Sequence, residues 1–330
     1  MCVPCILETL SSLWLYVLTY PFYILIVLCL FHIRKDPEFN VPFYKLVLSL
    51  GCMDLVNIAV PLIYMDFANW GLISVQWFLY SPAGQAAGTV LSTLFAISST
   101  GQHIGVLFIA LDRFLLFVTP LVHSKISGIM GIKLPIVLHW VISAILGSIQ
   151  QPTFVVFRAT NQTTSAMEEA RMFLAAFCGL VTMLGCSMIV LFCYGVIFGK
   201  ALMIYKEVQS NSAKRMGLLT ALFGFSISSC LLIFVTYLLL EHFQISLATI
   251  DPQYQYLIFK IVGNLYTGLN PYCLIAFIPN FRSQFFQFLK AVGAKCKSAV
   301  QKQDQAYGDD SNPNHLVLRA AWAPKSATMS

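Results

Sequence analysis

The sequence is short of charge. Asp, Glu, Lys and Arg together make up 10% of its 330 residues, whereas hydrophobic residues make up 58%. An average soluble domain is about 25% charged, so this composition excludes an ordinary soluble protein and predicts a membrane protein. The net charge of +6 does not predict nucleic-acid binding, because the basic residues gather beside apolar runs, where they set topology and attract anionic lipid.

Several other signals are missing as well. The chain has no Gly/Ser-rich linker, low-complexity tract, internal repeat or pair of inverted halves, so a single helical bundle describes it. No Cys or His spacing matches a metal site: "CVPC" at 2–5 has no second pair, and His103 and His139 lie singly in different apolar runs. We therefore predict no metal, no cofactor and no enzymatic activity.

Seven apolar stretches are long enough to cross a bilayer, which takes about 20 residues in a helix. They are predicted as helices because each is far longer than a barrel strand and must satisfy its backbone polar groups internally. The predicted spans cover residues 12–32, 43–65, 87–113, 134–152, 172–199, 216–240 and 254–278. The fold class is therefore an all-α membrane protein, a bundle of seven transmembrane helices.

The basic residues predict the orientation of this bundle. Of the 20 Lys and Arg residues, all but Arg158, Arg171 and Lys260 fall on one side of the predicted membrane. By the positive-inside bias that side is cytoplasmic, so the N-terminus is outside and the C-terminus inside, as seven spans require. The predicted parts are a short extracellular N-terminus, a helical membrane domain and a flexible cytoplasmic tail, at residues 1–11, 12–290 and 291–330.

Three surface features follow from this map. Phe281, Phe285 and Phe288 recur at helical spacing after the seventh span, which predicts an amphipathic helix on the inner membrane surface. Cys296 follows in "AKCKS", a basic setting that suits palmitoylation, with a free thiol as the alternative. Asn161 begins the only N-glycosylation sequon and lies on the predicted outer side.

Asp112 and Arg113 end the third apolar run. A charge at the bilayer centre costs about 3 kcal/mol, so this pair must sit at an interface or face protein. At the inner end of a bundle, an arginine can be held by a neighbouring carboxylate in one arrangement and released toward a partner protein in another. The alternative is that Arg113 is there only because of the positive-inside bias and that Asp112 has no function beside it.

A second group of polar residues lies at mid-membrane. Asp54 is near the middle of the second span, with Asn57 one turn later on the same face. An ionisable group at that depth is a functional candidate if it faces the bundle interior. Asn270 and Pro271 lie in the seventh span, where the proline removes one helical hydrogen bond and provides a hinge. The alternative is a neutral Asp54 with purely structural hydrogen bonds.

These motifs resemble those of the rhodopsin-like G-protein-coupled receptors. Their third helix ends in Asp-Arg-Tyr with a Pro-Leu at the offset seen in "DRFLLFVTPL", residues 112–121, where Phe114 replaces the tyrosine. Their second helix carries Leu-x-x-x-Asp, and their seventh carries Asn-Pro-x-x-Tyr, where Leu274 stands at the tyrosine position. The resemblance implies that Asp54 binds sodium or a proton and contacts Asn270.

Other stretches narrow the resemblance. Gly88 stands where the third-helix disulfide cysteine of the receptors is expected, and "YPFYILIVLCLFHIRK", "FYKLVLSLGCMDLVN" and "NPYCLIAF" are similar to the nematode serpentine chemoreceptors of class V and their class G relatives. The resemblance covers residues 12–290. It implies a multi-pass receptor of the cell membrane, with the cilia of chemosensory neurons as a candidate location. Its implied partners are a small-molecule ligand and a heterotrimeric G protein.

The resemblance places the ligand between the outer halves of spans three, five, six and seven. Phe95 stands where amine receptors have an Asp, so a cationic amine would meet an apolar wall. Lys260 either reaches the membrane interface or neutralises an acidic ligand, and Asn264, one turn further in, occupies the place of the opsin Schiff-base lysine. A receptor for a peptide and a secondary transporter are the alternatives. A transporter needs paired intramembrane charges, and the spans offer only Asp54 and Lys260.

Overall fold

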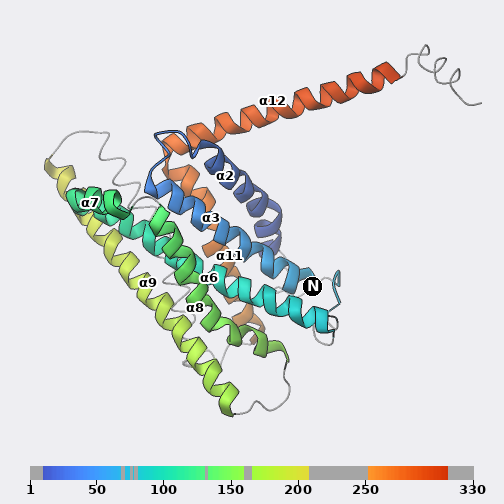
Figure 1. Cartoon of the computed structure of the whole chain (residues 1–330), viewed down its shortest axis with the longest axis vertical. Helices are drawn as coiled ribbons and strands as arrows, with labels where there is room; N and C mark the ends of the chain where they lie inside the picture. The colour runs from blue at the N-terminus through green and yellow to red at the C-terminus, as the bar shows by residue number, and fades with distance from the viewer. Residues whose placement is uncertain are drawn as a thin grey trace, which may run out of the picture. The chain divides into compact units, whose positions relative to one another are not determined.

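The computed structural model of the chain describes residues 10–67, 71–74, 77, 81–130, 133–159, 166–207 and 252–310. These residues form helices joined by short connections, and they contain no strand (Figure 1). In chain order the elements are η1 (Trp14–Thr19), α2 (Tyr20–Ile33), α3 (Pro42–Pro61), η2 (Leu62–Asp66), α6 (Pro82–Val118), α7 (Pro120–Met130), α8 (Lys133–Ala159), α9 (Ala166–Glu207), α11 (Pro252–Phe277) and α12 (Pro279–Asp310).

Prolines mark where many of these helices begin. The first residues of α3, α6, α7, α11 and α12 are Pro42, Pro82, Pro120, Pro252 and Pro279. The first N–H of a helix has no partner inside the helix, so a proline there costs nothing. Ser81 adds a cap to α6 by accepting a hydrogen bond from the Gly84 N–H at 3.3 Å. At the other end, Pro120 disfavours helical geometry at Thr119, whose φ and ψ are −133° and 66°, so α6 ends at Val118.

The helices agree with the predicted spans. Among the described residues, four stretches are long and apolar enough to cross a membrane: Leu10–Ile33, Pro42–Pro61, Pro82–Val118 and Phe177–Lys200. They coincide with predicted spans one, two, three and five, while spans four and seven fall on α8 and α11. The sixth predicted span, 216–240, lies outside the described residues.

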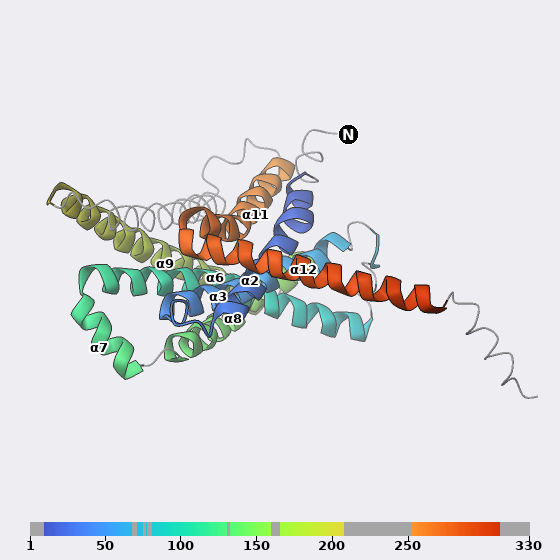
Figure 2. The same cartoon turned by 90° about the horizontal axis from the view of Figure 1, so that it is seen from above.

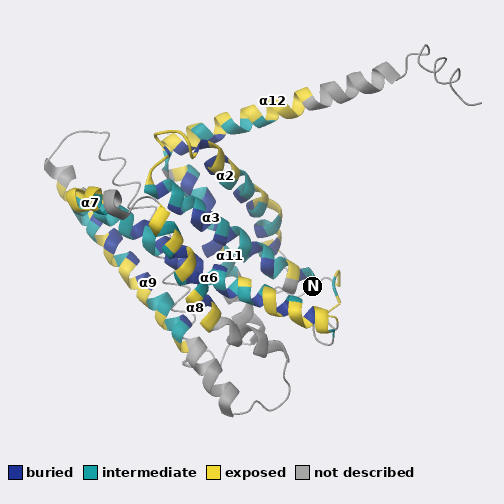
Figure 3. Cartoon of the chain, viewed as in Figure 1, coloured by how far each residue is buried: buried dark blue, intermediate teal, exposed yellow. Residues whose placement is uncertain are grey.

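Helix α6 is the centre of the described bundle. It packs against α3, α8 and α9, while α2 packs against α3, and α11 contacts α2 and α3 (Figures 1 and 2). Buried residues lie on the facing sides of these helices and exposed residues on the outer sides (Figure 3). The main cluster of buried side chains comes from α3, α6, α9 and α11: Phe43, Leu46, Leu50, Val106, Ile109, Ala110, Val190, Cys193, Tyr194, Ile197 and Tyr266.

A glycine allows α8 to lie close against α6. A Cβ atom added at Gly147 would lie 2.5 Å from the Cα of Ile97 and 2.7 Å from its backbone nitrogen. Both atoms belong to the α6 backbone, which cannot move aside as a flexible side chain could. Glycine at this position therefore sets the spacing of the two helices.

The chain divides into two compact units, Met1–Pro279 and Asn280–Ser330. In the second unit, α12 runs to Asp310, beyond residue 290, where we predict the membrane-surface helix to end. Phe281 stacks on Phe285 with ring centroids 6.2 Å apart, and Arg282 and Lys290 are exposed. This pattern fits an amphipathic helix, and its position on a membrane stays a prediction.

Candidate functional site

A buried carboxylate joins several helices of the first unit. Asp54 on α3 is 0% exposed. Its Oδ2 accepts hydrogen bonds from the Tyr23 hydroxyl of α2 and, at 2.9 Å, from Asn270 Nδ2 of α11. Its Oδ1 accepts from Gln102 Nε2 of α6 at 2.7 Å. The donors come from three different helices, so the carboxylate holds α2, α6 and α11 to α3.

The polar network continues beyond Asp54. Asn57 Nδ2 donates to Gln102 Oε1 at 3.0 Å and to Thr267 Oγ1 at 3.4 Å, and Ser98 Oγ donates to Asn57 Oδ1 at 3.4 Å. Gln102 Nε2 also lies 3.3 Å from Thr267 Oγ1. Each amide therefore has its orientation fixed by at least one neighbour. The orientation of Gln102 is set from both ends, because its oxygen accepts from Asn57 while its nitrogen donates to Asp54.

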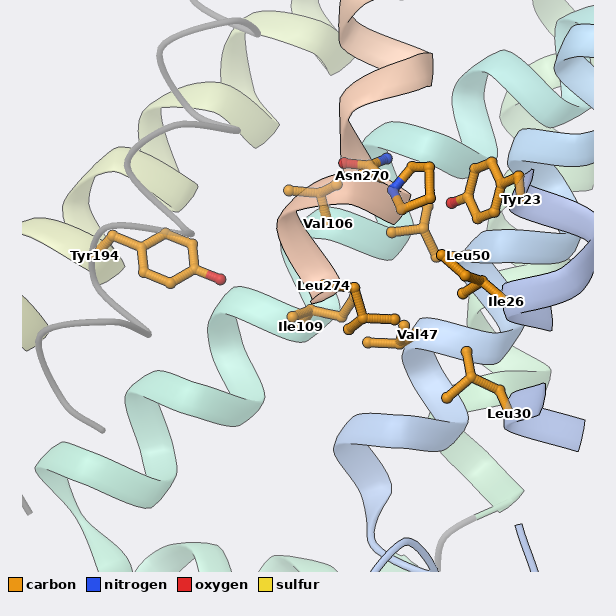
Figure 4. A pocket seen from close by; sticks show the side chains of 11 residues that line it. Tyr23, Ile26, Leu30, Val47, Leu50, Val106, Ile109, Tyr194, Asn270 and Leu274 are labelled. Carbon is orange, nitrogen blue, oxygen red and sulfur yellow. The ribbon is translucent and has the colours of Figure 1, made fainter. Parts of the chain in front are cut away.

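A small cavity lies next to Asn270 and Pro271. It has a volume of about 20 Å³, enough for one water molecule. The Asn270 Oδ1 atom is buried and has no hydrogen-bond partner among the described residues. The cavity is lined by Tyr23, Ile26, Leu30, Val47, Leu50, Val106, Ile109, Tyr194, Asn270, Pro271 and Leu274 (Figure 4). Leu274, at the position of the receptor tyrosine, thus contributes an apolar wall. Pro271 has no N–H to offer the Thr267 carbonyl one turn earlier in α11.

The residues at the end of α6 have separate partners. Asp112 Oδ1 lies 3.1 Å from His123 Nε2 on α7. The guanidinium carbon of Arg113 lies 3.5 Å from the centroid of the Phe43 ring on α3. Arg113 Nε is buried without a hydrogen-bond partner, and no ion pair of Arg113 occurs in the described part of the chain. Phe114 faces Phe192 of α9, with ring centroids 6.2 Å apart. In this arrangement the neighbouring carboxylate does not hold the arginine.

Lysine from a neighbouring helix caps the same end of α6. Lys200 Nζ on α9 donates to the Phe117 carbonyl at 2.8 Å and to the Val118 carbonyl at 3.2 Å. The last carbonyls of a helix have no partner inside it and carry the negative end of the helix dipole, so a cation is favourable there. This contact ties the end of α6 to α9.

Two of the predicted ligand residues, Phe95 and Asn264, lie away from the cavity beside Asn270. Phe95 is half-buried on α6, and its carbonyl accepts from Ser98 Oγ at 3.0 Å. Asn264 Nδ2 donates to Ser11 Oγ at 2.7 Å, which ties α11 to the start of the first span. Lys260 lies on α11, one turn before Asn264. Neither Phe95 nor Asn264 lines that cavity.

The histidines of the spans serve packing. His139 Nε2 lies 2.8 Å from the Gly101 carbonyl, which can only accept, so Nε2 carries the proton. Its Nδ1 then accepts from Ser49 Oγ at 2.8 Å, and Ser49 Oγ accepts from Trp140 Nε1 at 2.9 Å. His103 donates from Nδ1 to the Ser99 carbonyl at 2.7 Å and stacks on Tyr266. No group of three metal-ligating side chains occurs among the residues that the structure describes.

The structure describes one of the two predicted modification sites, Cys296 but not Asn161. Cys296 is exposed on α12 and is a free thiol. Asn161 lies outside the described residues.

Sequence reasoning found Asp54, Asn57 and Asn270 but missed Tyr23 and Gln102. A polar side chain in an apolar run was the available signal for Gln102, which lies in "SSTGQH" at 98–103. Tyr23 gave no such signal, because tyrosines in apolar helices are common as packing residues. His123 was also missed, since its contact with Asp112 depends on how α7 turns back after Thr119.

A buried carboxylate shared between apolar helices that are long enough to cross a membrane defines a membrane protein of several spans with a polar centre. Comparison with family models agrees with this class: residues 13–291 match the Srv family of serpentine type 7TM GPCR chemoreceptors. Because the match covers most of the chain, the protein belongs to this family.

Membership confirms two predictions from the sequence. The predicted resemblance to the class V serpentine chemoreceptors is confirmed, and so is a membrane-embedded fold of seven transmembrane helices. The chain is thus a chemoreceptor-family membrane protein that is similar to the G-protein-coupled receptors in its seven-helix fold. The orientation of the bundle stays a prediction. A comparison with curated proteins finds no match.

Proposed function

We propose that this receptor binds a small-molecule ligand from the outer side of the membrane and activates a heterotrimeric G protein through the inner ends of its helices. The observation that carries the proposal is the state of Arg113, whose Nε is buried without a partner at the end of α6. A buried guanidinium N–H with no acceptor among the described residues is costly, so an acceptor offered by a partner when the bundle opens lowers the free energy.

The surface beside Arg113 supports a docking site for that partner. Leu121 is 80% exposed and Val122 is 45% exposed at the start of α7, and Lys125 is exposed one turn later. Large apolar side chains that stay exposed next to basic residues favour a protein interface. On the predicted topology this surface faces the cytoplasm, where the G protein is found.

The network around Asp54 provides a route from the ligand to that surface. An inward or outward swing of α11 at Pro271 moves Asn270, and breaking its bond to Asp54 leaves the carboxylate held by Tyr23 and Gln102 alone. Gln102 and Arg113 lie on the same helix, so a change at the network is passed to the inner end of α6. Binding of sodium or a proton at Asp54 would bias the same equilibrium.

The ligand binds between the outer halves of the helices in this proposal. Phe95, Lys260 and Asn264 lie on α6 and α11, and their chemistry favours a neutral or acidic molecule over an amine. Asn161 is the expected glycosylation site, Cys296 the expected lipidation site, and the cell membrane, including sensory cilia, the expected location. Membrane lipid is the expected partner of α12.

The test is nucleotide exchange in lipid vesicles that contain the full-length receptor and a purified heterotrimeric G protein. Pools of small molecules are applied, and binding of a non-hydrolysable GTP analogue is measured. At least one pool should raise exchange on the wild type, and Arg113→Ala should abolish the response while the receptor remains folded and correctly inserted. Accumulation of a labelled compound inside the vesicles, without any exchange, would establish a transporter instead.

A further inference from the structure

Resting on the proposed function, we propose that Phe43 is the resting-state partner of Arg113: its ring positions the guanidinium and withholds it from the G protein. In this role Phe43 is a positioning residue, which acts through Arg113 and does not itself touch the G protein.

The geometry leaves the ring as the principal contact of the cation. The guanidinium carbon lies 3.5 Å from the centroid of the Phe43 ring, well within the range of about 6 Å over which a cation is attracted to an aromatic face. Phe43 is 5% exposed and belongs to the main buried cluster, so the ring is fixed and little water screens the contact.

The acidic candidate for this role has a different partner. Asp112, beside Arg113 in the sequence, lies 3.1 Å from His123 Nε2. Arg113 Nε has no hydrogen-bond partner in the described residues, so no polar group competes with the ring for that atom. Among the described residues, the direct contact of the guanidinium is thus an aromatic ring and not an ion pair with a carboxylate.

The contact joins the second and third spans at one end of the bundle. Phe43 is near the first turn of α3 and Arg113 near the last turn of α6, so separation of these two ends exposes the guanidinium. A cation–π contact has no directional hydrogen bond to break, and it weakens gradually as the ring and the cation part. Release by a modest helix movement is the expected behaviour.

Fluorinated phenylalanines at residue 43 test the proposal directly. Each added fluorine withdraws electron density from the face of the ring and changes its size little, so the cation–π attraction falls. The edge contact between Phe43 and Tyr44, with ring centroids 5.1 Å apart, also responds to fluorine, and a variant without the arginine separates the two effects. Ligand-independent nucleotide exchange should rise stepwise from Phe to trifluoro-Phe, by roughly tenfold, the ratio equal to about 1.4 kcal/mol. Phe43→Trp should keep ligand-independent exchange as low as in the wild type, since tryptophan binds cations best among the aromatic side chains.

Phe39 is the matched control. It is 1% exposed and packs on Tyr44, with ring centroids 4.8 Å apart, and no contact with Arg113 is present. The same fluorine series at residue 39 should leave basal exchange unchanged. If exchange is flat across the series at residue 43 while Phe43→Leu alters it, Phe43 acts by packing and the proposal is overturned.

A second readout separates this proposal from the proposed function. In purified receptor, fluorination at residue 43 should lower the melting temperature stepwise in the wild-type background and leave it unchanged in Arg113→Gln. If melting follows this pattern but no variant stimulates exchange, the contact stands and the G-protein function fails. If melting is insensitive to fluorine in both backgrounds, the contact with Arg113 is not cation–π.

Discussion

Asp54→Asn is the perturbation that tests the polar network most sharply. The two side chains have nearly the same shape, so the change adds no void. It replaces one acceptor oxygen of the carboxylate with an NH₂ group, which must then face a donor. At Oδ1 the new group meets Gln102 Nε2, and at Oδ2 it meets Tyr23 and Asn270. At least one hydrogen bond is lost in either orientation.

The magnitude follows from these contacts. A hydrogen bond to a charged group contributes about 1.5–3 kcal/mol, and leaving a buried donor unpaired costs about 1–3 kcal/mol. Gln102 cannot flip its amide to relieve the clash, because its oxygen would then leave Asn57 Nδ2, which lies 3.0 Å away. We therefore expect Asp54→Asn to destabilise the folded receptor by at least about 2 kcal/mol.

Free buried cysteines make the assay simple. Cys29, Cys186 and Cys193 are buried thiols, so a thiol-reactive fluorescent dye reports melting of the purified receptor as these groups become accessible. Asp54→Asn should melt at a clearly lower temperature than wild type, whereas Asp36→Asn, at an exposed carboxylate, should not.

Adding Gln102→Glu to Asp54→Asn should restore part of the lost stability, because the swap pairs a donor with an acceptor again. If Asp54→Asn has the same melting temperature as the wild type, the carboxylate does not hold the helices together and the relay through it is refuted.

Two further predictions concern helix packing. Gly147→Ala should lower the melting temperature, at a cost of about 1–3 kcal/mol, because its Cβ would lie 2.5 Å from the Ile97 Cα; Gly185→Ala, with no atom within 4 Å, is the control, and equal melting of the two variants would contradict the packing of α8 on α6. Lys200→Met should speed amide hydrogen exchange at Thr119 and His123, because it removes the cap from the Phe117 and Val118 carbonyls. Lys295→Met on α12 should leave those amides unchanged, and identical exchange in both variants would show that Lys200 does not hold this end of α6.

Hydropathy was sufficient to place the helices but not to orient their side chains. The spans follow from apolar length alone, and the start of α6 at Pro82 could have been read from Ser81 followed by proline. Residues 82–86, the start of α6, lie outside the predicted third span, 87–113, because they are small and only weakly apolar.

The partners inside the site depend on how each helix is rotated about its axis, which the sequence does not encode locally. The Asp54–Asn270 contact was expected through a family resemblance, whereas Tyr23 was not, because a tyrosine on α2 could equally have faced lipid. Phe43 lies far from Arg113 in the sequence, and only the packing of α3 on α6 brings the ring over the guanidinium.

The most direct test of the account is to find on which side of the membrane Arg113 lies. Epitopes at the two termini and a third in the connection after Met130, close to the end of α7, can be labelled with antibodies on intact and permeabilised cells. We predict that the N-terminal epitope is labelled on intact cells and that the other two are labelled only after permeabilisation. Labelling of the third epitope on intact cells would place the arginine outside and contradict its role in binding a G protein.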